Sequence, residues 1–356
     1  MEQQYNNEIL KLLRKSKNIS QHEMCERIGV SQGNYSKIEH GLSEPSNDFI
    51  EKVSILFQVN PTFFFQDEKA YAPYNPYHRS RSTLQVGDRD RVEAIANIYR
   101  IHISKLLEGV ETPFNLRPIL VTESESSKAI ARLTRRNFNL PKGPIDNLTK
   151  LLEDNGIFLV SYDFKTEALD GFTIQGSKDI IPLIFINSTF PGERIRFTLA
   201  HELGHLIMHQ QLEIEHNNII EKEATDFASE FLMPEQDIIQ DLRYLNTIKL
   251  NIETLIRLKI KWKVSMNALL KRAEDLNVFT KNQTKYIWMQ MAQRGYRKKE
   301  PHPMPLEKPL LLNELIDTYK NDLQYSINDM IDLLKITQDT YFEYFDNERP
   351  RFRVVK

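Results

Sequence analysis

Apolar residues recur along most of the chain at the three- and four-residue spacing of amphipathic helices. A long example runs from Arg89 to Leu107, where Val92, Ile95 and Ile98 share one face. Three shorter stretches are instead β-branched and aromatic and are bounded by Gly, Asp or Asn: residues 156–162, 171–175 and 180–187. The pattern predicts a mainly α protein with a small α+β part.

Near the N-terminus, two short apolar-periodic segments are joined by Gly29 and Val30. Ser20 and Ser31 are suitable N-caps for the two helices, and Gly41 is a suitable C-terminal stop. Two short helices joined by a tight turn are typical of a helix-turn-helix, whose second helix enters the DNA major groove. We predict that residues 1–66 form a five-helix DNA-binding bundle. Its expected core consists of Ile28, Val30, Ile38, Val53 and Leu56, sealed by Phe63 to Phe65.

The rest of the chain divides by composition. Residues 67–88 are rich in Tyr, Pro, Ser and Arg, and their apolar positions show neither helical nor strand spacing. This composition predicts a linker partly extended by Pro73 and Pro76. The helix that begins at Arg89 is expected to pack against the following core or a partner subunit. We predict a core over 89–245, a helical subdomain over 246–300 and a C-terminal helical region over 301–356. This last region fits two helices between Leu310 and Phe345, and it could be a sensor, a dimer element or part of a cap.

The strongest chemical signal is the segment TLAHELGHLIMH, residues 198–209. In a helix His201 and His205 lie on one face and can hold one metal ion, while Glu202 can reach a water bound beside it. An accidental match is the alternative, but the apolar neighbours place this helix in the interior, where an unpaired polar cluster is costly. His209 rises about 12 Å above His201 along a straight helix, so we expect a helix-end or cleft-wall role for it.

A third ligand must come from elsewhere, and the next helical stretch offers Glu221, Glu223 and Glu230 before Pro234. Glu221 shares its face with small side chains at Ala224, Thr225 and Ala228, which would let this helix approach the metal-binding one. The residues therefore favour Glu221 over Glu223. Two histidines and a glutamate form a known catalytic Zn²⁺ set, although Mn²⁺ or Fe²⁺ also suits such ligands.

The motif HELGHLIMH, followed by EKEATDFASEFLMP, resembles the ImmA/IrrE family of bacterial metallopeptidases, a compact zincin-like fold. The resemblance extends from about Arg89 to Glu300 and implies that Glu221 is the third ligand. Thr225 stands where the family often has Asn or Asp, which leaves a hydrogen bond to a ligand histidine open. Zincins place a short sheet beside the active helix, and its edge strand binds the substrate. Ile184 to Asn187 is the expected edge, with a fully buried strand as the alternative.

The segment from Asn6 to Phe65 resembles XRE/Cro-type helix-turn-helix domains of phage repressors. By position, Gln32, Gly33, Asn34 and Lys37 would face base edges, and Gln21 would meet the DNA backbone. Gly33 has no side chain with which to read a base. Acidic residues offset the basic ones in this segment, so a role in dimerisation or partner binding alone is the alternative. The pair of helices expected around Val264 and Ser265 hints at a second such unit, with a structural role favoured over DNA binding.

Composition adds few constraints. A length of 356 residues suggests two or three domains, and 40% hydrophobic with 27% charged residues is ordinary for a globular protein. The net charge of -2 says little about partners. Cys25 is the sole cysteine, at an expected core position, so an internal disulfide is excluded. No signal peptide or membrane-spanning run is present, and we expect a cytoplasmic protein, bacterial or phage-encoded.

Together these features predict a DNA-binding transcriptional regulator with a zinc-dependent endopeptidase domain. The family resemblance implies cleavage of a repressor or antitoxin-like protein that controls phage, mobile-element or stress genes. The expected partners are operator DNA, a repressor-like protein substrate and a second copy of the chain in a homodimer, with no membrane. The alternative is a one-component transcription factor or antitoxin whose metallopeptidase-like domain senses a metal or ligand without proteolysis.

Overall fold

A computed structural model describes residues 4–67, 69–70, 85–111, 125–174, 182–209, 218–247 and 251–345. Most of the predicted linker, including Pro73 and Pro76, lies outside these residues, as do Gln175 and Ile180 of the predicted strands. The protein is mainly helical with one small sheet, as the pattern of apolar positions predicts. Among the described residues, no helix combines the length and apolar content needed to span a bilayer.

The N-terminal bundle contains α1 (Asn7–Ser16), α2 (Gln21–Ile28), α3 (Gln32–Glu39), α4 (Asn47–Phe57) and the 3-10 helix η1 (Pro61–Phe65). Ser20 and Ser31 cap α2 and α3, each accepting a hydrogen bond from the backbone N–H three residues later. Gly29 ends α2 with a φ of 69°, a left-handed conformation that glycine adopts without strain. The turn is therefore encoded locally, by two caps and one glycine.

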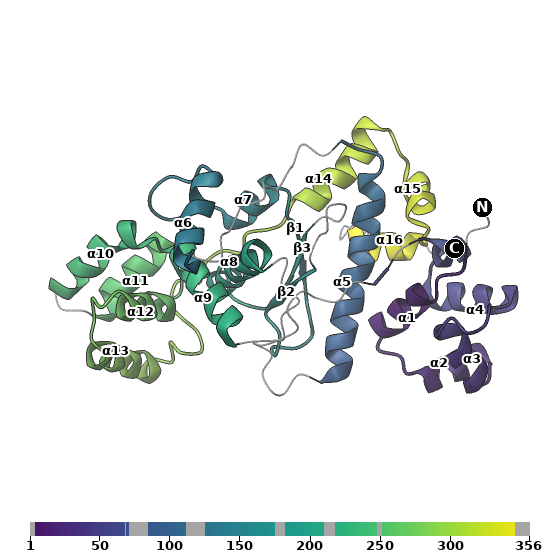
Figure 1. Ribbon diagram of the computed structural model, residues 1–356, viewed down its shortest axis with the longest axis horizontal. Helices are drawn as coiled ribbons and strands as arrows, with labels where there is room; N and C mark the ends of the chain where they lie inside the picture. Colours follow the sequence, from purple (N-terminus) through teal and green to yellow (C-terminus); the bar gives the residue numbers. More distant parts are fainter. Residues whose placement is uncertain are drawn as a thin grey trace, which may run out of the picture.

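Helix α5 (Val86–Leu107) lies between this bundle and the sheet (Figure 1). It packs against α1 on one side. On the other side, the guanidinium of Arg91 donates to the carbonyl of Phe164, and the ring of Tyr99 lies 5.8 Å from that of Phe185. The prediction that this helix packs against the core is confirmed, and the helix also joins the core to the bundle.

The sheet has three strands, β1 (Phe158–Tyr162), β2 (Gly171–Ile174) and β3 (Leu183–Asn187), in the order β1-β3-β2. Strand β3 pairs in parallel with β1 and antiparallel with β2, and all five of its residues are buried. The expectation that Ile184 to Asn187 form the sheet edge is therefore wrong. Strand β3 is central because it pairs with one strand on each side, so β1 and β2 are the outer strands of the described sheet. The full burial of β3 agrees with the alternative of a fully buried strand.

Two hydrophobic cores lie on opposite faces of this sheet. Leu183 and Phe185 point into a core shared with the N-terminal bundle, α5 and the C-terminal helices. Ile184 and Ile186 point into a second core, which contains the remaining helices. These are α6 (Ser127–Asn137), α7 (Leu148–Asp154), α8 (Gly192–Met208), α9 (Asn218–Leu232), α10 (Glu235–Thr247), α11 (Ile252–Trp262), α12 (Met266–Asp275) and α13 (Lys281–Gln293).

The C-terminal region contains more helical segments than the two helices predicted for it. It contains α14 (Leu311–Asp317), a π-helical turn η2 (Thr318–Asp322), α15 (Ile327–Leu334) and α16 (Gln338–Phe345). Ser326 starts α15 with a capping box, and Lys335 ends it in a left-handed conformation, which explains the extra break. The region packs on α5 and reaches the N-terminal bundle, where Ile336 forms a β-bridge with Val59.

Candidate metal centre and nucleic-acid interface

Helix α8 carries the HELGH motif through the interior. It packs between the sheet and α9, and His201, Glu202 and His205 are each less than 10% exposed. Because residues four apart lie on one face of a helix, the two imidazoles point the same way. Their Nε2 atoms are 3.0 Å apart.

Glu221 reaches this pair from the first turn of α9. Its carboxylate oxygens lie 3.3 Å from Nε2 of His201 and 3.0 Å from Nε2 of His205. Burial alone raises the pKa of Glu221, but hydrogen bonds and charge interactions with the two histidines hold it well below its ordinary value. The other two candidates lie elsewhere: Glu223 is near His209, and Glu230 forms ion pairs with Arg132 and Arg272.

The three groups fit a divalent metal ion. Zn²⁺ binds imidazole nitrogen and carboxylate oxygen at about 2.0–2.2 Å, and tetrahedral ligands at that distance are roughly 3.3 Å apart. The two Nε2 atoms are 3.0 Å apart, and those of His201 and His205 lie 3.3 Å from Oε2 and 3.0 Å from Oε1 of Glu221, respectively, which is close to that spacing. Within the described part of the chain, His201, His205 and Glu221 form the group of at least three His, Cys, Asp or Glu side chains whose ligand atoms lie close enough together to hold one ion.

Glu202 is positioned by the sheet. The hydroxyl of Thr173, on the outer strand β2, donates to Oε2 of Glu202 at 2.8 Å. Both side chains are buried. Sequence analysis did not identify Thr173, since a contact between a strand and a helix 29 residues apart leaves no local pattern.

Gly204, inside the HELGH motif, is a second residue that sequence analysis missed. A Cβ atom at this position would lie 3.0–3.3 Å from three atoms of the Phe227 side chain on α9. The absence of a side chain therefore lets α8 and α9 pack closely enough for Glu221 to reach the histidines. The small face of α9 also contributes, because Ala224 and Ala228 are fully buried.

The outer nitrogens of the two histidines face different partners. Nδ1 of His201 lies 3.5 Å from the hydroxyl of Thr225, so the position that differs from the family pattern still contacts a histidine of the site. Nδ1 of His205 lies 3.1 Å from Nδ1 of His209, and Nε2 of His209 lies 3.2 Å from a carboxylate oxygen of Glu223. Burial and the neighbouring His205 lower the pKa of His209. His209 is the C-cap residue of α8, which confirms the predicted helix-end position.

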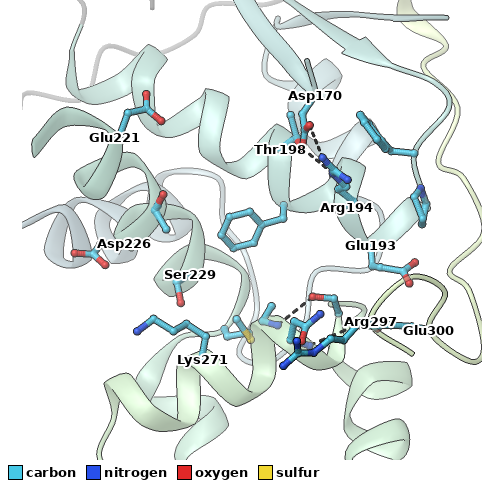
Figure 2. Close-up of a pocket in the computed structure, with 18 of the residues that line it drawn as sticks. Asp170, Glu193, Arg194, Thr198, Glu221, Asp226, Ser229, Lys271, Arg297 and Glu300 are labelled. Atoms are coloured by element: carbon cyan, nitrogen blue, oxygen red, sulfur yellow. Dashed lines mark hydrogen bonds and ion pairs between the residues drawn. The ribbon is translucent and has the colours of Figure 1, made fainter. Parts of the chain in front are cut away.

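A cleft of about 1070 Å³ opens beside this centre (Figure 2). Glu221 and Thr225 line it from α9, and Arg194 lines it from α8, where it forms an ion pair with Asp170. The opposite wall includes the exposed face of α12, with Asn267 and Lys271, together with Arg297, Lys298 and Glu300. Of the α11–α12 pair that resembles a second helix-turn-helix, α12 therefore lines the cleft.

Helix α3 presents its predicted DNA-reading positions to solvent. Gln32, Gly33, Asn34 and Lys37 are all exposed, whereas Tyr35 and Ile38 on the other face are buried. In Figure 1 this helix lies at the outer end of the N-terminal bundle, away from the sheet. Its exposed face is thus accessible to a large partner such as a DNA duplex.

Gln21, predicted to contact the DNA backbone, is half-buried at the start of α2. Its amide donates to Glu39, which also accepts a hydrogen bond from Tyr35 at 3.0 Å and forms a bidentate ion pair with Arg14. Burial raises the pKa of Glu39, but the hydrogen bonds from Arg14 and Gln21 outweigh it and leave the pKa below its ordinary value. This buried network joins three helices of the bundle.

Comparison with known families supports both parts of the chain. Residues 152–274 match the peptidase family model described as the IrrE N-terminal-like domain, and residues 10–64 match the helix-turn-helix model. The chain therefore combines a DNA-binding type of domain with a metallopeptidase type of domain, as the two resemblances imply. The first match is shorter than the expected span from Arg89 to Glu300. A search of curated proteins found no match.

Proposed function

We propose that this chain is a DNA-binding transcriptional regulator whose second domain is a zinc-dependent endopeptidase. The observation that carries the proposal is the convergence of His201, His205 and Glu221 beside Glu202, at one end of a large cleft. The region around them matches a peptidase family. We take residues 89–245 as the peptidase core and 246–300 as the helical subdomain that forms the far wall of the cleft.

His201, His205 and Glu221 would hold the ion, and Zn²⁺ in such a site lowers the pKa of a water to about 7 and polarises a carbonyl group. Glu202 is not needed as a ligand and acts as the general base, taking the proton of the attacking water. The hydrogen bond from Thr173 would hold the Glu202 carboxylate in position for this role. Glu202 then returns the proton to the amide nitrogen as the peptide bond breaks. The substrate would lie in the cleft as an extended segment near Asp170, which lines the cleft directly before β2, an outer strand that packs against α8.

The N-terminal domain would direct this activity. Gln32 and Asn34 are suited to pair with adenine and Lys37 with guanine or phosphate, while Gln21 lies near the DNA backbone. Because the domain is not strongly basic, we propose that it binds a specific operator as a homodimer. The proposed substrate is a repressor or antitoxin-like protein whose cleavage relieves repression.

The test is digestion of candidate repressor proteins by the purified full-length chain with Zn²⁺, followed by mass spectrometry of the fragments. The wild type should produce a defined cut that a chelator abolishes. A cut that persists with the same yield in Glu202→Gln would remove Glu202 from the mechanism and attribute the activity to a contaminant.

The second candidate is a one-component regulator that senses a metal or ligand without proteolysis. It is favoured by the hydrophobic core that the N-terminal bundle shares with one face of the sheet, since that core could transmit a change at the site to the DNA-binding domain. Operator affinity that changes with Zn²⁺, together with no cleavage of any partner, would establish this function in place of the first.

A further inference from the structure

We propose that Arg194 and Arg297 select an acidic side chain of the substrate, about four residues from the bond that is cut. Arg194 lines the cleft from α8, and Arg297 lines it from the opposite wall, in the segment between α13 and α14. The two arginines are thus specificity-determining residues outside the metal centre. The inference rests on the proposed peptidase function, and its test has separate outcomes for the failure of each.

A stripe of polar residues on α8 leads from the metal centre to Arg194. Arg194, Thr198 and Glu202 follow each other at intervals of four residues, so they lie on one face of the helix. Arg194 and Thr198 both line the cleft. Along a helix, the rise from Arg194 to Glu202 is about 12 Å, which an extended peptide covers in about four residues. A substrate that is cut beside Glu202 and follows the stripe therefore reaches Arg194 at that spacing.

Strand β2 and the residue before it lie beside the same stripe. At one end, the hydroxyl of Thr173 donates to Glu202 at 2.8 Å. At the other end, Arg194 forms an ion pair with Asp170, the residue directly before β2. The stripe and the outer strand therefore run side by side, and a substrate segment that enters the cleft near Asp170 also lies near Arg194.

The guanidinium of Arg194 is held in place with one edge unused. It donates to Asp170 from Nε at 2.8 Å and from Nη2 at 2.6 Å, and it stacks 3.7 Å above the ring of Phe190. Nη1 has no hydrogen-bond partner among the described residues, and the side chain is 39% exposed. Because arginine has five N–H donors, the edge formed by Nη1 and Nη2 can still donate two hydrogen bonds to a carboxylate.

The opposite wall supplies a positive charge that is not balanced within the described part of the chain. Arg297 is exposed and forms no ion pair with a described residue. Two acidic residues of the cleft, Glu193 and Glu300, are each paired with the buried Lys259. Glu167 also lines the cleft, but it is exposed, so solvent screens its charge.

The two arginines together favour a carboxylate over an uncharged group. Asp170 already balances the charge of Arg194, so this pair alone would accept a main-chain carbonyl as readily as an acid. Arg297 adds the charge that distinguishes the two. In Figure 2 both arginines lie at the end of the cleft away from Glu221, as expected for recognition at a distance from the cut bond.

The test is digestion of a peptide mixture, prepared from unrelated proteins, by the full-length chain with Zn²⁺. Mass spectrometry of the fragments locates each cut, and we expect Asp and Glu to be enriched about four residues from it. Two synthetic peptides that differ only by Glu or Gln at this position then give a ratio of kcat/KM values. We expect this ratio to be on the order of ten in the wild type, and Arg194→Met and Arg297→Met should each remove most of it.

Lys271→Met is the matched control, because Lys271 lines the same cleft from α12 and forms an ion pair with Asp275. This variant should keep the wild-type ratio. An equal loss in Lys271→Met would attribute the preference to the general charge of the cleft and overturn the proposal. Arg297 is exposed, so Arg297→Met keeps the test decisive if Arg194→Met does not fold.

Two further outcomes separate this proposal from the proposed function. Cuts by the wild type without a preference for acidic residues would overturn the selection by Arg194 and Arg297 and leave the peptidase function intact. The absence of any cut, in the mixture and in the candidate repressors alike, would count against the peptidase function and remove this proposal with it.

Discussion

At the scale of single residues, the carboxylate of Glu202 depends on a hydroxyl from another element. Thr173→Val keeps the branched shape of the side chain and removes the hydrogen bond to Glu202. A hydrogen bond to a charged group contributes about 1.5–3 kcal/mol, so the rate of peptide cleavage should fall roughly 10- to 100-fold. Steady-state kinetics measures this effect. Zn²⁺ affinity should remain unchanged because Glu202 is not a proposed ligand.

Thr134→Val is the matched control for this prediction. Thr134 is fully buried and its hydroxyl donates to the carbonyl of Ile130 in α6, with no contact to Glu202. This variant should keep wild-type kinetics. Equal kinetic losses in the two variants would show that removal of any buried hydroxyl disturbs the site, and the positioning role of Thr173 would then be rejected.

Two exposed residues of α3 have different proposed roles: Asn34 reads a base, and Lys37 supplies a positive charge. Asn34→Ala should reduce discrimination at one base pair by about 1–3 kcal/mol, since a bidentate contact to adenine is lost. Lys37→Ala, if Lys37 contacts phosphate, should weaken binding to all sequences and reduce the salt slope by about 1. Fluorescence anisotropy with a selected operator and its single-base variants, at several salt concentrations, measures both effects. Equal loss on every sequence for Asn34→Ala would remove it as a base reader.

At the scale of elements, the distance between α8 and α9 sets the geometry of the metal centre. Gly204→Ala places a Cβ atom 3.0–3.3 Å from Phe227, so the two helices must move apart. Overpacking of this kind costs about 1–3 kcal/mol of folding free energy. Zn²⁺ affinity should fall as well, because Glu221 and the histidines come from the separated helices. Chemical denaturation and chelator competition measure the two effects.

Gly33→Ala provides the matched control. Gly33 is helical, and a Cβ atom there meets nothing within 4 Å. The same substitution should therefore leave stability unchanged or raise it by up to about 1 kcal/mol, as alanine is the better helix former. Equal stability of the two variants would contradict the close approach of α8 and α9 at Gly204.

The elements that sequence predicts well are those with local signals. The caps Ser20 and Ser31 and the turn at Gly29 lie within a few residues of the helices that they define. His201 and His205 are related by helical spacing alone, and the small residues on the same helix face favour Glu221. These features depend on contacts within one helix or one turn, which is why the pattern of residues is sufficient.

What the sequence could not predict depends on contacts between distant elements. The apolar side chains of Ile184 and Ile186 indicate a buried strand, but they do not indicate whether it pairs with one strand or with two. The central position of β3 depends on its pairing with both β1 and β2, which no local pattern specifies. Thr173 and Glu202 are 29 positions apart, and no periodicity connects a strand residue to a helix residue. The β-bridge between Ile336 and Val59 joins residues 277 positions apart.

At the scale of the whole molecule, His102 lies where three parts of the chain meet. Its ring is 5.7 Å from Phe63 of the bundle, 5.8 Å from Tyr344 and 5.5 Å from Phe345 of α16. Among the described residues, Nε2 of His102 finds no hydrogen-bond partner. Burial lowers the pKa of His102 from 6.5 to about 3. The imidazole must therefore stay neutral while this junction is intact.

This lowered pKa predicts a loss of stability in acid. Above the unfolded-state pKa of about 6.5 both states are neutral, and the pKa shift has no effect. As the pH falls from there toward 3, the unfolded chain binds a proton that the folded chain does not, so the free energy of unfolding decreases. Denaturation at several pH values should show this slope in the wild type and a reduced slope in His102→Phe. Exposed His22→Gln is the control and should retain the wild-type slope.

The shared core predicts that the DNA-binding bundle does not unfold independently of the C-terminal region. Thr337 N–H donates to the carbonyl of Gln58 at 3.1 Å, Asn60 N–H donates to that of Lys335 at 2.9 Å, and Ile336 between them is 3% exposed. Ile336→Ala should destabilise this core by about 2–5 kcal/mol. Hydrogen exchange should then become faster in the bundle itself, for example at Val53, which is fully buried.

Met291→Ala is the counterpart in the second core, where Met291 is fully buried. Loss of this buried side chain should lower the free energy of unfolding by a similar amount, but the sheet separates Met291 from the N-terminal bundle. It should therefore leave exchange at Val53 close to that of the wild type. If neither variant changes exchange at Val53, the bundle is stable without its C-terminal contacts and behaves as the separate unit that the domain boundary after residue 66 predicts. If only Ile336→Ala does so, the N-terminal bundle and the C-terminal region form one cooperative unit that does not include the second core.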